Sequence, residues 1–317
     1  MTSRALRSFL FLLTLSFLFV DVSVSISFVQ AAVGVIARQI PSWLRLIRTS
    51  KFFSSILNKL KSFFNMFKEL KLGNIAEGVS NVKQYLDLFG YLNSTLHSNF
   101  SDEFTLDLQS AIIKYQKNFN LKVTGQIDRK TYNIISQQRC GVPDIINGTT
   151  TMNMGNSNTT PFTPWWKAGK KVLSYAVHPQ NNVSDSVKVL FREAFDRWSK
   201  VTLVNFTETA SFNESDVRIT FLELDGKGGT VGGADRNYSL GVGSVYLDSE
   251  EEWVVRGENE EGDVDLESVV MHMIGHLLGL GHSSVEEAVM YPIVLPEKKT
   301  ELSYDDMQRI HQIYHVK

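Results

Sequence analysis

The chain has 317 residues, of which 43% are hydrophobic, and its formal net charge at pH 7 is -2. This length and apolar content suit one or two buried cores and exclude a disordered or fibrous protein. The near-neutral charge gives no general attraction to nucleic acid, so a nucleic-acid partner is not expected.

The N-terminus, residues 1–31, has the layout of a secretory signal peptide. Arg4 and Arg7 precede an apolar run over residues 9–20, and cleavage would fall near Ala31. The alternative is an uncleaved membrane anchor, but the run is shorter than the roughly 18 residues that a spanning helix needs. The end of the chain lacks the polar spacer and apolar tail of a lipid anchor. We therefore predict a protein secreted to the extracellular space, cell wall or matrix, without a stable membrane anchor.

Eight Asn-x-Ser/Thr sequences support export, because such sequences accept N-linked glycans in secreted proteins. They begin at Asn93, Asn99, Asn147, Asn158, Asn182, Asn205, Asn213 and Asn237. Secreted proteins usually pair their cysteines, whereas this chain has a single one, Cys140. An unpaired thiol in an oxidising compartment requires burial or another role.

Residues 32–74 are basic and predict an amphipathic helix. The apolar side chains recur every three or four residues, at Phe52, Ile56, Leu60, Phe63, Phe67 and Leu70. We expect a pro-region helix that packs on neighbouring parts of the chain. The alternative is a helix that lies on a membrane surface.

The next segment, residues 75–147, predicts a small and mostly helical domain. Apolar residues recur with helical spacing over 82–91 and 106–119. A stretch rich in glycine, asparagine and threonine, residues 148–160, is expected to be an exposed linker. A second domain would then occupy residues 161–317.

Strands and helices alternate in the predicted second domain. Strands are expected at 172–177, 201–208, 217–224 and 245–248, helices at 186–200, 266–278 and 304–314, and a glycine-rich loop at 226–243. The helix at 186–200 would bury one apolar face, made of Val187, Leu190, Phe191, Ala194, Phe195 and Trp198.

Three histidines cluster in the predicted helix at 266–278 and just after it. His272 and His276 are four residues apart, which places both rings on one face of a helix. Gly279 lets the chain leave the helix and turn back, so that His282 can supply a third nitrogen. Three protein ligands leave the fourth tetrahedral position of a zinc ion open, as in catalytic zinc sites. Unrelated structural histidines are the alternative, but they would not explain this spacing.

The sequence around these histidines resembles the extended zinc signature of the metzincins. Met290 resembles their methionine turn, and the stretch Arg-Cys-Gly-Val-Pro-Asp from Arg139 to Asp144 resembles the cysteine switch of plant matrix metalloproteinases. The resemblance covers about residues 75 to 315. It implies an α+β zinc domain, with a twisted mixed sheet and three helices, after a helical pro-domain similar to a peptidoglycan-binding module. It also implies that the Cys140 thiolate fills the open zinc position and keeps a zymogen latent.

The sequence departs from this family at the residue after the first zinc histidine. The family has a glutamate there, the general base that accepts a proton from zinc-bound water, and this chain has Met273. A thioether cannot carry that proton, and general acid–base catalysis is worth roughly 10²–10⁴-fold in rate, so we predict severely impaired peptide hydrolysis. Glu267 would lie about 140° around the helix from His272, and Glu286 and Glu287 follow the third histidine, so none is placed to substitute. A misread codon is the alternative origin of Met273.

The resemblance also bears on two further metal sites. The family's structural zinc uses a His-x-Asp pair and two later histidines; the pair is absent here and the later positions are Gly233 and Tyr246, so we expect no zinc there. A calcium site is better preserved, because carboxylates provide the hard oxygen ligands that calcium prefers. Its ligands would be Asp225, Asp248 and Glu251, with backbone carbonyls of Gly226, Gly228 and Thr230 implied by the resemblance. The alternative is a solvated acidic loop.

Two hypotheses of function follow from these observations. In the first, the chain is a secreted zymogen-type metalloendopeptidase that acts on extracellular proteins or peptides, with residual zinc catalysis. In the second, it is a pseudoprotease that binds peptides or inhibitors without cutting them. A third, a cell-wall-binding module at residues 75–136, is less favoured, because the resemblance implies that this module packs on the active-site cleft as the chain's own pro-domain.

Overall fold

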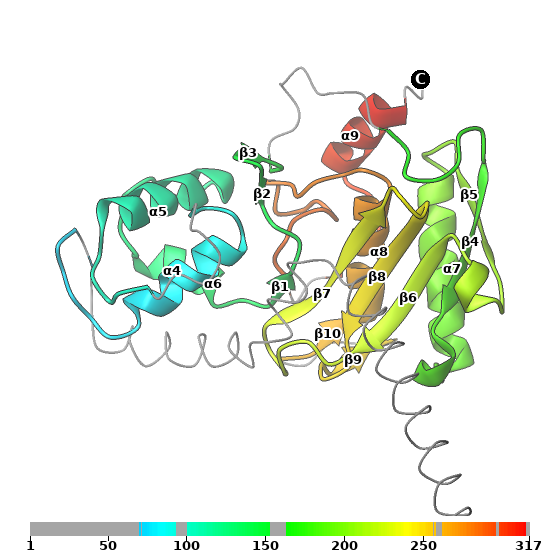
Figure 1. Ribbon diagram of the computed structural model, residues 1–317, viewed down its shortest axis with the longest axis horizontal. Helices are drawn as coiled ribbons and strands as arrows, with labels where there is room; N and C mark the ends of the chain where they lie inside the picture. The colour runs from blue at the N-terminus through cyan, green and yellow to red at the C-terminus, as the bar shows by residue number, and fades with distance from the viewer. Residues whose placement is uncertain are drawn as a thin grey trace, which may run out of the picture. The chain divides into compact units, whose positions relative to one another are not determined.

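The structure is a computed structural model (Figure 1). It describes residues 70, 72–92, 100–152, 163–255, 257, 262–295 and 298–314. These residues all belong to the compact unit Leu46–Lys317. The predicted signal peptide and nearly all of the predicted basic helix lie outside the described residues. None of the helices that the structure describes is long and apolar enough to cross a membrane.

The described chain begins with a helical module. Its α-helices are α4 (Val79–Leu88), α5 (Leu106–Asn118) and α6 (Arg129–Ile135). Helices α5 and α6 begin after Thr105 and Asp128, whose side-chain oxygens accept hydrogen bonds from backbone N–H groups of the first turn. The helices enclose an aromatic core that includes Tyr85, Phe89 and Tyr115, all fully buried. The predicted helical module is confirmed, although the sequence pattern did not predict α6.

A short hairpin follows these helices. Strand β2 (Ile145–Ile146) pairs antiparallel with β3 (Thr149–Thr150), and Met152 is buried against the helical module. The start of the predicted linker therefore packs on the module, while its remainder lies outside the described residues. The domain boundaries given above stay predictions.

The later part of the described chain is built on a mixed six-stranded sheet. Its strands are β1 (Arg139–Cys140), β4 (Val172–Val177), β5 (Asn205–Glu208), β6 (Val217–Leu222), β7 (Thr230–Asn237) and β8 (Val242–Asp248). They lie in the order β1-β7-β8-β6-β4-β5; β7 is antiparallel to β8, and all other neighbours are parallel. A separate parallel pair is formed by β9 (Trp253–Val254) and β10 (Val264–Asp265).

The glycine-rich segment at 226–243 differs from its prediction, because its residues 230–237 form β7 and its last two residues begin β8, so it is not all loop. Gly232 pairs with Leu247 of β8, and a Cβ atom on Gly232 would collide with the backbone carbonyl oxygen of Tyr246. Glycine here permits a close approach of two strands, which is one of its recognised positions in a sheet.

Two long helices, α7 (Asp185–Ser199) and α8 (Leu266–Leu277), lie side by side on one face of the sheet, and α9 (Tyr304–Tyr314) follows them (Figure 1). Short 3-10 turns occur at η1 (Pro179–Asn181) and η2 (Phe212–Glu214). The buried residues of α7 are the six apolar residues of its predicted face: Val187, Leu190, Phe191, Ala194, Phe195 and Trp198. Together, the mixed sheet and three helices confirm the predicted α+β fold.

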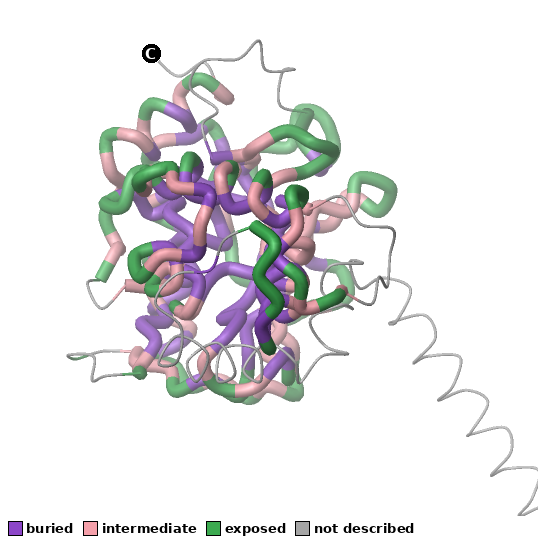
Figure 2. Tube along the Cα trace, turned by 90° about the vertical axis from the view of Figure 1, so that its left-hand side faces the viewer, coloured by how far each residue is buried: buried purple, intermediate pink, exposed green. Residues whose placement is uncertain are grey.

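The two parts of the chain have separate apolar cores. One lies between the sheet and helices α7 and α8, and the other lies within the helical module. Cys140 belongs to the first core, whereas Tyr291 and Ile293, far along the chain, belong to the second. Figure 2 shows buried residues gathered in the interior and exposed residues mainly at outer turns. The segment around Cys140 therefore lies where the two cores meet.

Candidate metal centre

Helix α8 positions two of the three predicted histidines. It begins after Asp265, whose carboxylate accepts hydrogen bonds from the backbone nitrogen (2.9 Å) and hydroxyl (2.7 Å) of Ser268. It ends at Leu277 with Leu278 as its C-cap, and the next residue, Gly279, has a φ of 104°, which glycine adopts without strain. The chain then turns back toward the helix and brings His282 to it, as the sequence pattern predicted.

The structure brings the three histidines and Cys140 together. The ring centroids of His272 and His276 are 4.6 Å apart, those of His276 and His282 4.9 Å, and those of His272 and His282 5.3 Å. The sulfur of Cys140 lies 3.5 Å from Nε2 of His276. One ligand atom from each of the four residues lies within 4.8 Å of the others, and each residue is at most 6% exposed.

Hydrogen bonds hold each ring by its Nδ1 atom. Nδ1 of His272 lies 2.8 Å from the carbonyl oxygen of Val289, and Nδ1 of His276 lies 2.9 Å from that of Leu280. Carbonyl oxygens only accept, so these rings donate from Nδ1 and keep the Nε2 lone pair free for a metal. Among the described residues, the buried Nε2 atoms of His272 and His282 have no hydrogen-bond partner. Unpaired buried nitrogens beside a thiol fit a zinc ion.

Burial sets the protonation of this group. It lowers the pKa of all three histidines, and that of His272 and His276 falls well below the usual value. The rings are therefore neutral, the form that binds metals. Burial also raises the pKa of the Cys140 thiol to about 12, so a thiolate at this position requires a nearby cation such as zinc.

Asp144, which the sequence pattern gave no separate role, contacts the third histidine. Its Oδ1 lies 2.7 Å from Nδ1 of His282 and 2.6 Å from Nη2 of Arg139, and both side chains of the Arg139–Asp144 pair are fully buried. Burial is the largest single influence and opposes ionisation of Asp144, but the charge of Arg139 and the hydrogen bonds with His282 and Arg139 together outweigh it, and the pKa of Asp144 falls to about 2. No spacing rule reveals this contact, because Asp144 and His282 are 138 residues apart.

Comparison with known proteins agrees with this geometry. Residues 165–315 match the family described as Matrixin, and residues 76–135 match the family described as putative peptidoglycan binding domain. The chain is 40% identical over 300 residues to Metalloendoproteinase 5-MMP of Arabidopsis thaliana, covering 84% of this chain and 82% of the relative. It is 40% identical over 262 residues to Metalloendoproteinase 1 of Glycine max, covering 77% of this chain and 84% of the relative. The chain belongs to the plant matrix metalloproteinases.

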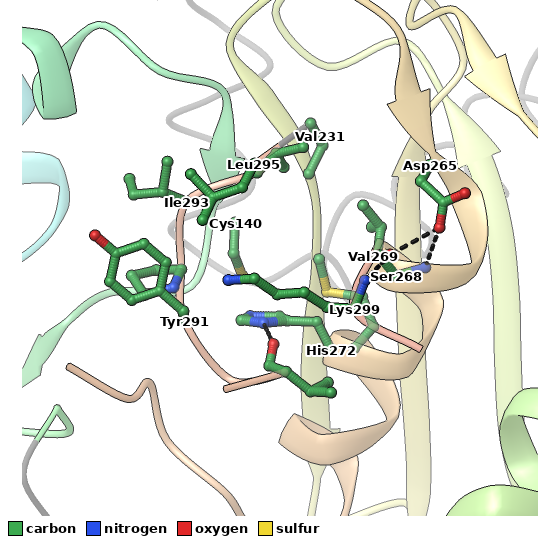
Figure 3. Close-up of a pocket in the computed structure, with 14 residues that line it drawn as sticks. Cys140, Val231, Asp265, Ser268, Val269, His272, Tyr291, Ile293, Leu295 and Lys299 are labelled. Atoms are coloured by element: carbon green, nitrogen blue, oxygen red, sulfur yellow. Dashed lines mark hydrogen bonds between the residues drawn. The ribbon is translucent and has the colours of Figure 1, made fainter. Parts of the chain in front are cut away.

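A small cavity adjoins the matrix metalloproteinase centre (Figure 3). Its volume is about 40 Å³, and Cys140, His272 and the fully buried Met273 contribute to its lining. Tyr291, Ile293 and Leu295 line one wall, and the first turns of α8 line the other (Figure 3). Met273 therefore lines the same cavity as the first histidine and the thiol.

Of the three glutamates considered as substitutes for the missing base, one forms an ion pair and two are exposed to solvent. Oε1 of Glu267 pairs with Nη1 of Arg197 on α7 at 2.5 Å. Glu286 and Glu287 are exposed on the loop after His282. None of the three lines the cavity beside His272, and their lack of a role as general base stays a prediction.

Met290 packs against the helix that carries the histidines. It is fully buried, and a Cβ atom on Gly275 of α8 would collide with the Met290 sulfur. The backbone nitrogens of Val289 and Met290 donate to the buried carboxylate of Asp306, at 2.8 and 3.1 Å. The predicted methionine turn is therefore fixed from α9 and lies against α8 between His272 and His276.

The acidic residues predicted to bind calcium are connected through the loop backbone. The backbone nitrogen of Asp225 donates to Asp248 (3.4 Å), and that of Gly228 donates to Glu251 (2.9 Å). Burial raises the pKa of Asp225 to about 8, and the nearby charges of Asp248 and Glu251 add to this rise. A cation would relieve the repulsion among these carboxylates.

The predicted structural-zinc positions, Gly233 and Tyr246, face each other across β7 and β8. A glycine has no side-chain ligand, and burial raises the pKa of the Tyr246 phenol, which keeps it protonated. Neither residue offers a good zinc ligand, and the expected lack of a structural zinc stays a prediction.

Proposed function

We propose that this matrix metalloproteinase is secreted as a latent zymogen whose zinc is held by His272, His276 and His282, with Cys140 in the fourth position. The observation that supports this most directly is the convergence of three neutral, buried imidazoles and one thiol on a common point. When bound, zinc would polarise a substrate carbonyl and acidify a water molecule.

The stretch from Arg139 to Asp144, called the pro-segment below, is proposed to occupy the place where a peptide substrate would bind. The backbone nitrogen of Cys140 donates to the carbonyl oxygen of Pro292, and that of Gly141 donates to Gly232 of β7, both at 2.8 Å. Strand β1 thus adds to the edge of the sheet, the mode by which extended peptides bind many proteins. A substrate would use the same backbone groups, so the pro-segment must leave first.

We further propose that Met273 leaves this centre without its proton carrier. Met273 lies in the cavity beside His272, and Glu267, the acid nearest to it in the helix sequence, pairs with Arg197 instead. A loss of roughly 10²–10⁴-fold in hydrolysis is expected from the missing general base alone. Extracellular peptides or proteins would bind, and cleavage would be slow.

The alternative function is a pseudoprotease that binds peptides or inhibitors without cleaving them. The same observations favour it. The four converging ligand residues and the β7 edge on which a peptide could pair are present, whereas Met273 cannot act as a general base. The two proposals differ only in whether slow hydrolysis follows binding.

One experiment separates these functions. Residues 160–317 are purified with stoichiometric zinc, and cleavage of a quenched fluorescent peptide is compared with that by Met273→Glu and by Met273→Gln, which has a similar shape but no proton carrier. We expect Met273→Glu to gain roughly 10²–10⁴-fold and Met273→Gln to gain little. Equal rates for wild type and Met273→Glu would show that hydrolysis is not impaired. A wild-type domain that binds the peptide without any zinc-dependent cleavage would support the pseudoprotease.

The acidic group of Asp225, Asp248 and Glu251 is proposed as a calcium site. Its support is the raised pKa of the three carboxyl groups, whose charged forms burial disfavours unless a cation is present. Carbonyl groups of Gly226, Gly228 and Thr230 would supply further oxygens by resemblance to the family.

A further inference from the structure

We propose that Asp144 of the pro-segment is a positioning residue for the zinc ligand His282, so that the pro-segment supports the metal centre through an outer hydrogen bond as well as through Cys140. This inference rests on the proposed binding of zinc by the three histidines. It gives a role to the Asp144 carboxylate, which no sequence spacing identified.

The three histidines differ in where their Nδ1 partners come from. His272 and His276 are held by backbone carbonyl oxygens within 17 and 4 residues of them in the chain, inside the zinc domain itself. His282 is held by a side-chain carboxylate 138 residues earlier. The contact from Nδ1 to Oδ1 of Asp144 is 2.7 Å, and both side chains are fully buried. The third ligand therefore takes its orientation from the pro-segment.

Asp144 is itself held firmly by the helical module. Its Oδ1 accepts from Arg139, and its Oδ2 accepts from the hydroxyl of Tyr91 at 2.9 Å. The Arg139 guanidinium lies 3.5 Å from the ring centroid of Phe89 and donates to the hydroxyl of Tyr85 at 3.0 Å. A continuous set of buried contacts thus connects the aromatic core of the module to a zinc ligand.

Such outer partners fix the tautomer and orientation of a ligand and raise its basicity, and their loss typically weakens metal binding by about 10–100-fold. When the pro-segment leaves, the Cys140 sulfur and the Asp144 carboxylate depart together. His282 remains in the zinc domain, but its Nδ1 atom loses the Asp144 carboxylate as a hydrogen-bond acceptor. Removal of the pro-segment should therefore weaken zinc binding by more than the loss of the Cys140 thiolate alone.

A purely structural role is the competing explanation, in which Asp144 serves only to pair with Arg139. Two single variants of the full chain distinguish them. Asp144→Asn and Arg139→Gln both break the same ion pair, but only Asp144→Asn also weakens the contact with His282. Tyr91→Phe is a further control, since it removes another hydrogen bond of the same carboxylate without touching His282.

Zinc affinity is measured for each full-length variant by competition with a chromogenic chelator. We expect Asp144→Asn to bind zinc about 10-fold or more weakly than Arg139→Gln, and Tyr91→Phe, which leaves the contact from Asp144 Oδ1 to His282 in place, to lose clearly less affinity than Asp144→Asn. Equal affinities of Asp144→Asn and Arg139→Gln would overturn the inference while leaving zinc binding intact. A wild-type chain without stoichiometric zinc would overturn both the inference and the proposed function.

A measurement on the unaltered chain covers the case in which Asp144→Asn does not fold. In zinc-loaded protein with ¹⁵N-labelled histidine, the Nδ1 atom of His282 should carry a proton that exchanges slowly with solvent. After a protease cuts the zinc-loaded full-length chain in the predicted linker, residues 148–160, and the pro-segment is removed, the same proton should exchange faster, while those of His272 and His276 keep their protection. Unchanged exchange at His282 after removal of the pro-segment would contradict the proposal.

Discussion

The substitution Gly232→Ala tests whether the close approach of β7 to β8 keeps the pro-segment in place. A methyl group on residue 232 would collide with the backbone carbonyl oxygen of Tyr246 and lie 3.3 Å from Cα of Leu247. Backbone atoms cannot turn aside as the end of a side chain can, so β7 must shift. Overpacking typically lowers the free energy of unfolding by about 1–3 kcal/mol. Alanine reduces the conformational entropy of the unfolded chain, which raises the free energy of unfolding by about 0.4–1 kcal/mol. The middle of each range gives a net destabilisation of about 1.3 kcal/mol, so we expect a loss of about 1–2 kcal/mol.

A loss of this size should lower the Tm by roughly 2–8 °C, because 1 kcal/mol shifts the Tm of a domain of 150–250 residues by about 2–4 °C. The same shift of β7 should loosen the pro-segment, since Gly232 accepts a hydrogen bond from Gly141, the neighbour of Cys140. Thermal unfolding and the rate at which a thiol reagent labels Cys140 measure the two effects. An unchanged Tm together with an unchanged labelling rate would refute the reasoning.

Two further predictions concern carboxylates. Glu267→Gln should leave any zinc-dependent peptide cleavage within about twofold of wild type, because Glu267 pairs with Arg197; a tenfold loss would instead identify Glu267 as a substitute base. Burial raises the pKa of Asp225 from 3.8 to about 8, so without calcium its contribution to stability is complete below pH 3.8 and is lost as the pH rises through about 8. Calcium should therefore raise the Tm most at alkaline pH, and a calcium-insensitive Tm at pH 8 would argue against a cation site.

Local patterns in the sequence predicted the parts of the fold that depend on neighbours in the chain. The apolar spacing of α7 identified all six residues of its buried face, and the four-residue spacing of His272 and His276 placed both rings on one side of α8. Gly279 predicted the end of that helix for a local reason as well, because its φ of 104° favours glycine.

Features that depend on distant contacts were missed or misread. The glycines of β7 resemble a loop in the sequence, since nothing local reveals that the carbonyl oxygen of Tyr246 leaves no room for a side chain at Gly232. The role of Asp144 depends on folding a residue of the pro-segment against His282, which no periodicity records. Met273 was recognised only by comparison with the family pattern, and its effect on hydrolysis stays a prediction.

The two-residue strand β1 has a consequence for the mature protein. It covers one border of the sheet by pairing with β7, whose other side is already paired with β8. If the pro-segment leaves as proposed, the outer N–H and C=O groups of β7 become open to any extended chain, including the same border of a second molecule. Unliganded mature protein should therefore self-associate or aggregate as its concentration rises, and a bound peptide should keep it monomeric.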